Sequence, residues 1–174
     1  MVQSARRMRP CELYLVRHAV AAERGDEWPD DSKRPLTAQG AGRFRDVVAG
    51  LVWLGVSIDE IFTSPLVRAR QTADLLAARL PEHPPVKPVD KLAPGHEIAE
   101  VIAELGKRVK RRRVAIVGHE PDLGELAAAL LGAQRALPFR KGGVCRIDVD
   151  GLGSTRAGTL IWFLPPKILR KAAR

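Results

Sequence analysis

Residues 13–22 read LYLVRHAVAA, and the predicted fold starts from this stretch. The apolar run Leu13–Val16 has the length and composition of a buried β-strand. The run stops at Arg17 and His18, so a cation and an imidazole follow directly on a buried strand. In open α/β sheets ligands bind outside the carboxyl ends of the strands. We therefore expect Arg17 and His18 to belong to a site at such an edge.

Two other predicted strands also end in polar residues. A strand over about residues 58–62 is followed by Thr63 and Ser64, with Arg68 one helical turn further on. A buried strand at 114–117 is followed by Gly-His-Glu, which places His119 at its end. If the three strands are neighbours in one parallel sheet, their polar ends converge.

Strands and helices alternate along the chain, which predicts a three-layer α/β/α fold with a mostly parallel central sheet. Thr37 and Ser64 are predicted helix N-caps, Pro65 is a predicted first helical residue, and Gly132 ends a helix. The first strand is expected over 12–16, and further strands near Val86, at 144–148 and at 159–164. The expected helices span 37–55, 64–80, 96–107, 121–132 and 165–174.

The composition is that of one globular domain, because 45% of the 174 residues are hydrophobic and can form a core. We expect a flexible basic leader over residues 1–10 and a single domain over residues 11–174. No apolar run is long enough to span a membrane, and no secretory segment follows the first residues. Cys11 and Cys145 are expected to be buried small residues in a reducing cytoplasm, and neither has metal-ligand spacing.

The net charge of +9 favours an anionic partner, such as phosphate, nucleic acid or an acidic protein. The densest basic run, residues 107–113, follows a predicted helix, whose dipole favours cations at that end. We interpret this run as a solvated helix end, because no nucleic-acid-binding signature or interleaved aromatic residue accompanies it. His83 and His96 have no partners in the sequence pattern and are expected on the surface.

Two arginines, two histidines and two helix N-termini at one sheet edge would make a phosphate site. Arginine can bind two phosphoryl oxygens at once, and free N–H groups at a helix N-terminus bind anions. Stabilising a transferring phosphoryl group suits this set of residues, with one histidine as the nucleophile. The candidate catalytic residues are Arg17, His18, Arg68 and His119.

The motifs LVRHA at 15–19, TSPLVRARQTA at 63–73 and VGHEPDL at 117–123 resemble those of the histidine phosphatase superfamily, which includes phosphoglycerate mutases and acid phosphatases. RPLTAQG at 34–40 and LIWFLPPKILR at 160–170 look most like the SixA-type phosphohistidine phosphatase branch. The resemblance covers about residues 13–132 and implies a phosphoglycerate mutase-like fold.

The resemblance implies a role for each candidate. His18 would be the nucleophile that forms a transient phosphohistidine, Arg17 and Arg68 would hold the phosphoryl oxygens, and His119 would donate to the same oxygens. Because these groups supply the charge, no metal and no other cofactor is expected. The further candidates for substrate binding are Ser64, Arg34 and Glu120.

Two features depart from the family pattern. Ala19 stands where the first motif usually has glycine, and a Cβ there matters only if φ is positive or the packing is tight. We expect this change to be tolerated with reduced activity. The segment 80–113 lacks the insertion that carries a proton-donating acid in larger relatives. Glu120 and Asp31 are candidate stand-ins, and the alternative for Asp31 and Arg34 is an ion pair that orders the loop.

Without a strong proton donor, phosphohistidine suits the site better than a phosphate ester, because its imidazole leaving group can be protonated near neutral pH. The sequence therefore predicts a metal-independent phosphohydrolase that acts on phosphohistidine in a protein through a phosphohistidine intermediate. The alternatives are a phosphomonoesterase or mutase for small molecules and a non-catalytic phosphate-binding module. Nucleic-acid and membrane partners are not expected.

Overall fold

The computed structural model describes residues 10–173, so the predicted basic leader lies, apart from Pro10, outside the described residues. The strands are β1 (Cys11–Arg17), β2 (Glu60–Thr63), β3 (Val86–Pro88), β4 (Arg113–Gly118), β5 (Val144–Val149) and β6 (Thr159–Leu164). The helices are α1 (Ala38–Trp53), α2 (Val67–Arg79), α3 (Ile98–Arg108), α4 (Asp122–Leu131) and α5 (Pro166–Ala172), with short 3-10 helices η1 (Asp31–Lys33) and η2 (Asp90–Leu92). None of the described helices has both the length and the apolar character needed to cross a bilayer.

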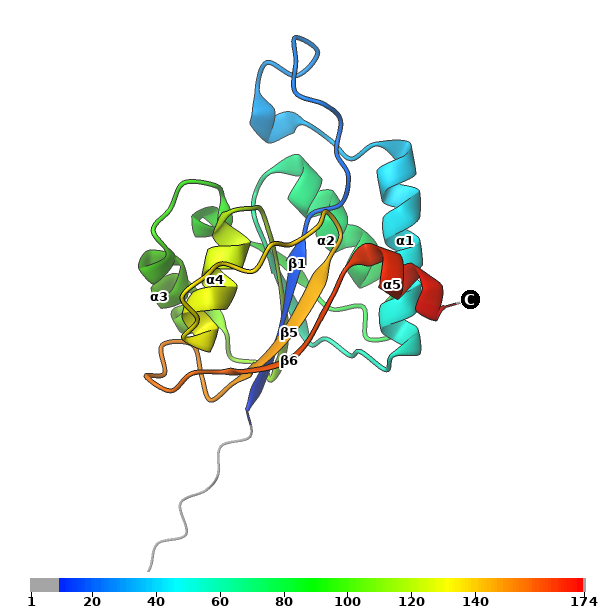
Figure 1. The fold of residues 1–174 in the computed structure, drawn as a ribbon. Coiled ribbons are helices and arrows are strands. Elements are labelled where there is room, and N and C mark those ends of the chain that lie inside the picture. The colour runs from blue at the N-terminus through cyan, green and yellow to red at the C-terminus, as the bar shows by residue number, and fades with distance from the viewer. Residues whose placement is uncertain (1–9, 174) are drawn as a thin grey trace, which may run out of the picture.

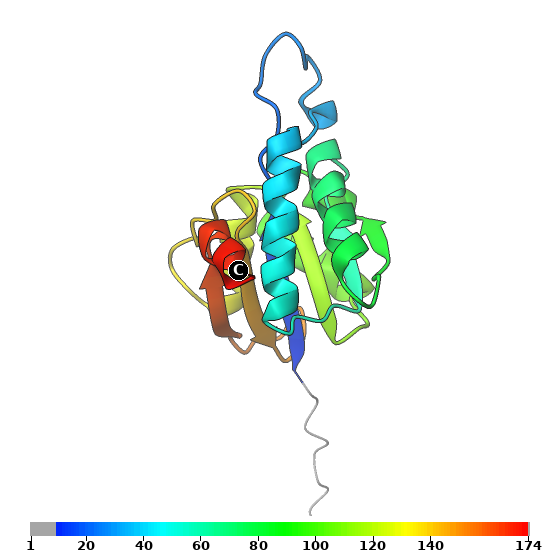
Figure 2. The ribbon, with the colours of Figure 1, turned by 90° about the vertical axis from the view of Figure 1, so that its right-hand side faces the viewer.

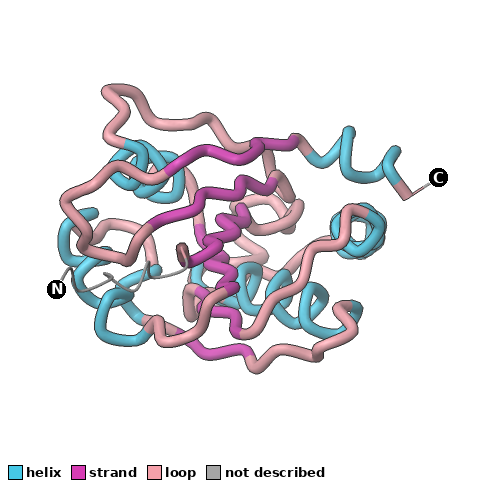
Figure 3. Tube along the Cα trace, turned by 90° about the horizontal axis from the view of Figure 1, so that it is seen from below, coloured by secondary structure: helices cyan, strands magenta, loops and turns pink. Residues whose placement is uncertain are grey.

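One six-stranded sheet in the order β3-β2-β4-β1-β5-β6 forms the middle layer. The first four strands of that order are parallel, whereas β5 runs antiparallel to β1 and β6 antiparallel to β5. Helices α1, α2 and α5 cover one face and α3 and α4 cover the other (Figure 1, Figure 2). The view from below shows helices on both sides of the band of strands (Figure 3). The predicted three-layer α/β/α fold with a mostly parallel sheet is confirmed.

The side chains of β1 alternate between two hydrophobic cores. Tyr14 and Val16 pack with residues of α1, α2 and α5. Leu13 and Leu15 pack on the other face with residues of α3 and α4. Since both faces of the strand are covered, it reads in the sequence as a continuous apolar run, which is why it could be predicted.

Two predicted helix ends are confirmed and one is wrong. Thr37 caps α1, because its Oγ1 accepts the N–H of Gly40 at 2.9 Å. Gly132 ends α4 in the left-handed conformation, with φ of 64°. Ser64 is not a helix N-cap and Pro65 is not the first helical residue, because α2 begins only at Val67. The Ser64 side chain is fully buried and contacts a histidine instead.

The basic run at residues 107–113 lies at the amino ends of the parallel strands, away from their carboxyl ends. It contains the last two residues of α3 and the first residue of β4. Arg108 pairs with Glu104 within α3, and Arg113 pairs with Asp59. The start of the run is therefore a helix end, as the sequence predicts.

Both cysteines are free thiols. Cys145 is buried in β5, as predicted, whereas Cys11 is only half-buried at the start of β1. Burial raises the pKa of Cys145 to about 12 and that of Cys11 to about 11. Neither thiol is a reactive thiolate at neutral pH.

Candidate active site

The carboxyl ends of β2, β4 and β1, which are neighbours in the sheet, carry the three polar clusters. Arg17 is the last residue of β1, and the N–H of His18 donates to Gly118 O at the end of β4, at 3.0 Å. Ser64 follows β2 and His119 follows β4 directly. The structure thus brings the predicted clusters together at one sheet edge, beneath the loop that rises above the molecule between β1 and α1 (Figure 1).

His18 is held in one orientation by its own chain. The side chain is 5% exposed, and its Nδ1 lies 2.7 Å from Ala19 O. A carbonyl oxygen can only accept, so Nδ1 carries the proton and the neutral ring has its lone pair on Nε2. Burial is the main reason why the pKa of His18 is lowered to about 4; nearby cations lower it further, and the Ala19 carbonyl opposes them. At neutral pH His18 is therefore an uncharged imidazole with a free Nε2 lone pair, the form that a nucleophile needs.

His119 lies against His18, with the two ring centroids 5.1 Å apart and the ring planes inclined by 54°. Its Nε2 lies 2.8 Å from Ser64 Oγ, and this oxygen accepts the N–H of Leu66 at 3.3 Å. Burial, followed by the charges of His18 and Arg68, lowers the pKa of His119 to about 3. His119 is therefore neutral at pH 7, and the buried Ser64 hydroxyl fixes its ring.

Arg68 and Arg17 bring two guanidinium groups to the histidines. Arg68, in the first turn of α2, is 3% exposed and donates to Asp31 O at 2.8 Å and to Asp31 Oδ2 at 3.0 Å. Arg17 Nη1 donates to Phe139 O at 2.6 Å. The Nε atoms of both arginines are buried and have no hydrogen-bond partner among the described residues. Incompletely paired cationic donors beside His18 favour an anion with several acceptor oxygens.

Asp31 forms the ion pair with Arg34 that the sequence suggests, and it also pairs with two other arginines. Its ion pair with Arg34 is present, with Arg34 Nε donating to Asp31 Oδ1 at 3.0 Å, and Arg34 also donates to Ala22 O at 2.6 Å. The same carboxylate pairs with Arg68 and Arg24. Burial alone would raise the pKa of Asp31, but the Arg34 hydrogen bond and the arginine charges hold it below its ordinary value. Asp31 is therefore ionised at neutral pH and is a poor proton donor.

Glu120 is the other candidate donor. It is half-buried next to His119, and its Oε1 accepts the N–H of Gly124 at 3.0 Å. Burial raises the pKa of Glu120, although the charge of Arg17 and the Gly124 hydrogen bond act against this. Of the two candidates, only Glu120 has surroundings that favour a protonated carboxyl group.

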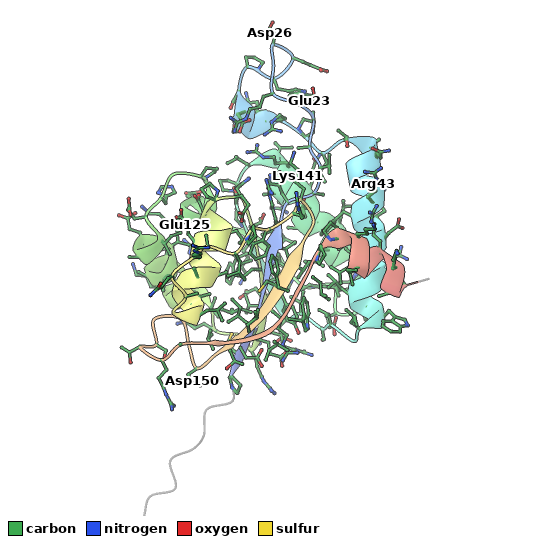
Figure 4. All side chains as sticks on the ribbon, in the orientation of Figure 1. Glu23, Asp26, Arg43, Glu125, Lys141 and Asp150 are labelled. Carbon is green, nitrogen blue, oxygen red and sulfur yellow. The ribbon has the colours of Figure 1, made fainter. Side chains whose placement is uncertain are left out.

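Two residues that hold the site were not predicted. Thr72 Oγ1 accepts the N–H of Ala19 at 3.0 Å and donates to Arg68 O at 2.7 Å, so it ties the His18 segment to α2. Its position four residues after Arg68 on a helix was the available signal. Lys141, in the loop before β5, lies at the same end of the molecule, above the start of β5 (Figure 4). Its charge contributes to the low pKa of His18, and no local sequence pattern indicates this effect.

Ala19 fits where the family usually has glycine. Among the described non-glycine residues only His83 has a positive φ, of 44°, so Ala19 needs no left-handed backbone. Ala19 is 2% exposed and packs in the core between the sheet and α1 and α2. The conformational condition under which a Cβ would be harmful is not met.

The remaining histidines lie outside this group. His83 is exposed, as predicted. His96 is only partly exposed, with its Nδ1 3.5 Å from Lys91 Nζ, so the prediction of a surface residue without a partner is wrong in part. Within residues 10–173 no three His, Cys, Asp or Glu side chains gather in a way that could hold a metal ion.

Comparison with known proteins gives the family. The family model described as Histidine phosphatase superfamily (branch 1) matches residues 13–93. An uncharacterised protein of a Picosynechococcus species is 41% identical over 138 residues, which cover 76% of this chain and 82% of the relative. Phosphohistidine phosphatase SixA of Escherichia coli K12 is 28% identical over 165 residues, which cover 92% of this chain and 98% of the relative. This chain belongs to the histidine phosphatase superfamily.

Within the superfamily the chain is SixA-like. The solved structure of the protein histidine phosphatase SixA complexed with tungstate matches it with a TM-score of 0.79 at 26% identity, covering 91% of this chain and 99% of the other. The chain is accordingly a phosphatase of the histidine phosphatase superfamily with a phosphoglycerate mutase-like fold. His18 and Arg68 lie within the matched family region, and His119 lies beyond its end.

Proposed function

We propose that this phosphatase hydrolyses phosphohistidine in a protein and that His18 is its nucleophile. One observation carries the proposal: His18 Nδ1 is bound to Ala19 O at 2.7 Å, which leaves the lone pair on Nε2 of a neutral ring beside Arg17 and Arg68. The similarity to SixA, a phosphohistidine phosphatase, over nearly the whole chain supports the substrate class.

The proposed reaction has two steps. In the first, His18 Nε2 attacks the phosphorus atom, a new N–P bond forms, and the N–P bond of the substrate breaks. The substrate imidazole leaves after taking up a proton. In the second, a water molecule attacks the phosphoryl group on His18, the enzyme N–P bond breaks, and inorganic phosphate leaves. Arg17 and Arg68 would stabilise the charge on the phosphoryl oxygens in both steps, and His119 would donate to them.

The two histidines and Asp31 are poor proton donors, and this supports an N–P substrate. The pKa of His18 is about 4 and that of His119 about 3, so neither ring is a charged acid at neutral pH. Asp31 is held ionised by three arginines. An alkoxide leaving group needs a positioned acid, whereas an imidazole is basic enough to take its proton near neutral pH.

A small-molecule phosphomonoesterase is the second candidate, and the environment of Glu120 favours it. Burial raises the pKa of this carboxyl group, which lies near Arg17, so Glu120 could protonate an ester oxygen. A non-catalytic phosphate-binding module would need His18 to be unreactive, and its neutral tautomer argues against that.

Two further parts of the proposal concern the molecule and its compartment. We propose that residues 11–174 act as one phosphatase domain, since both hydrophobic cores lie on the same sheet. The two free thiols suit a reducing environment, and we propose the cytoplasm as the site of action. No nucleic-acid or membrane partner is part of the proposal.

The test compares the wild-type enzyme with His18→Ala on two substrates, a phosphohistidine-bearing protein and p-nitrophenyl phosphate. We expect phosphate release from the phosphohistidine protein to exceed that from the ester and to vanish in His18→Ala. His83→Asn, which removes an exposed histidine, is the matched control and should keep the activity. Faster release from the ester, lost in Glu120→Gln, would favour the small-molecule enzyme. Release from neither, with tungstate still bound, would favour the binding module.

A further inference from the structure

A hollow of about 90 Å³ opens beside the active site. Its wall includes Ala19, whose Cα lies about 3.8 Å from that of His18 because the two residues are consecutive. Gly142, also in the wall, donates its N–H to His18 O at 3.1 Å. The hollow thus borders the backbone of the segment that carries His18.

Three cations line the hollow, and no acidic residue does: Arg43 from α1, Lys141 from the loop before β5, and Arg170 from α5. Figure 4 shows Arg43 and Lys141 at the same upper end of the molecule. The positive charge of Lys141 helps to lower the pKa of His18. The hollow and the reacting histidine thus share one electrostatic environment.

These three cations lack the carboxylate partners that other cations of the fold have. Arg70 pairs with Asp74, and Arg113 pairs with Asp59. Within residues 10–173 no ion pair involves Arg43, Lys141 or Arg170. In that same range Arg170 Nε is buried without a hydrogen-bond partner. Three like charges around one hollow repel each other, and an anion placed between them removes that cost.

The rest of the lining is apolar and limits what can enter. Phe44 and Val47 come from the buried face of α1, and Pro166 from the first turn of α5. The volume has room for several water-sized groups but not for a large ring system. A carboxylate on one or two methylene groups matches both the cations and the apolar lining.

We propose that this hollow is a second anion subsite, which binds an acidic side chain next to the phosphorylated histidine of the substrate protein. The inference rests on the proposed function. The carboxylate contacts Arg43, Lys141 and Arg170, its methylene groups contact Phe44 and Pro166, and the phosphoryl group lies at His18. The subsite selects phosphohistidines in acidic surroundings.

The test uses two phosphohistidine peptides that differ only in the residues flanking the phosphohistidine, Glu in one and Gln in the other. We expect the wild-type enzyme to have a KM about five- to tenfold lower for the Glu peptide, with similar kcat. Arg43→Gln and Arg170→Gln should each reduce this preference. Arg45→Gln removes the same charge from another side of α1, where it borders a different groove, and should keep it. Thermal unfolding of the variants shows whether they are folded.

Three results would overturn the inference. The first is an equal KM for both wild-type reactions, and the second is a preference that survives both Arg43→Gln and Arg170→Gln. The third is a lower KM for 3-phosphoglycerate than for the Glu peptide, lost in Arg43→Gln, because it would assign the hollow to the second anion of a small molecule. Failure of the proposed function looks different: neither peptide is hydrolysed, although p-nitrophenyl phosphate is.

Discussion

At the scale of the single residue, burial sets the chemistry of the two histidines. His18 is 5% exposed and His119 is 4% exposed, and both rings lie near arginines that disfavour a second positive charge. The consequence is a pair of neutral rings at neutral pH. The Ala19 carbonyl then selects which nitrogen of His18 bears the lone pair. An exposed histidine with the same neighbours in the sequence would have neither the lowered pKa nor the fixed proton position.

The low pKa values predict that the protein loses stability in mild acid. Below about pH 6.5 the unfolded chain protonates these histidines, whereas the folded chain keeps His18 neutral down to about pH 4 and His119 down to about pH 3. Acid therefore favours the unfolded state, and the free energy of unfolding should fall by on the order of 1 kcal/mol per pH unit and histidine in this range. Urea unfolding at pH 7.5, 5.5 and 4.5 measures it.

The double variant His18→Gln, His119→Gln isolates this contribution from that of the carboxylates. Its stability should fall less steeply between pH 6.5 and 4 than that of the wild type. His83→Asn controls for the loss of an exposed histidine. Equal slopes for the wild type and the double variant would show that the buried rings do not resist protonation.

Ala19 allows a second prediction at this scale. Its backbone has no positive φ and its methyl group is buried in the core, so Ala19→Gly gains no conformational relief and loses a packed group. We expect a loss of stability of about 1 kcal/mol and an unchanged kcat. Thermal unfolding and steady-state kinetics of the variant measure the two effects. A clear rise in kcat would mean that the Cβ lowers the activity, in line with the reduced activity expected from the sequence.

At the scale of the element, the loop between β1 and α1 reaches over the site through η1. Asp31 in η1 accepts two hydrogen bonds from Arg68, one on its backbone oxygen and one on its carboxylate. The carboxylate thus lies where it partly neutralises a cation that a phosphoryl group would use. Figure 4 shows Asp26 at the tip of the same loop and Glu23 lower on its side.

Removing that negative charge should strengthen anion binding. We expect Asp31→Asn to bind tungstate about fivefold more tightly than the wild type, because a repulsive charge beside Arg68 is lost while an oxygen acceptor is kept. Calorimetric titration measures the affinity. Asp30→Asn is the matched control, since among the described residues the Asp30 side chain hydrogen-bonds or pairs only with Ser32 and Lys33. Weaker binding by Asp31→Asn would instead identify Asp31 as a group that positions Arg68 for the anion.

At the scale of the whole molecule, the outer helices are held by close backbone approaches. A Cβ on Gly50 of α1 would lie 2.0 Å from Leu169 O of α5. A side chain of any size at Gly50 would therefore push α5 away, and α5 carries Pro166 and Arg170 at the edge of the hollow. On the same helix, a Cβ on Gly42 would have no atom within 4 Å.

This difference predicts opposite effects of one substitution at two positions of α1. Gly50→Ala should destabilise the protein by about 1–3 kcal/mol through overpacking. Gly42→Ala should stabilise it by about 0.5–1 kcal/mol, because alanine is the better helix former and the space is free. Chemical unfolding of both variants provides the comparison. Similar effects at the two sites would show that α5 can move away from α1 at no cost.

The layer architecture and the three strand ends that carry the polar clusters could be predicted from the sequence alone. Strands β1 and β4 are buried on both faces, so their apolar runs are visible without any contact information, and the polar residues that follow them mark the sheet edge. The arginine and histidine motifs at those ends were enough to predict the family. The layers and strand ends follow from local composition and periodicity, whereas the family follows from the resemblance of these motifs to those of known proteins.

How the site residues are held and charged depends on tertiary contacts that the sequence does not display. Ser64 was predicted to cap a helix and instead lies under His119, because the tertiary packing starts α2 two residues later. The pairing of Asp31 with Arg68 and the nearness of Lys141 to His18 join residues 37 and 123 positions apart. Desolvation and nearby charges shift a pKa according to which residues are close in space. The sequence shows only which residues are close along the chain. The pKa values of the histidines and the cationic hollow beside them therefore emerge only when the chain is folded.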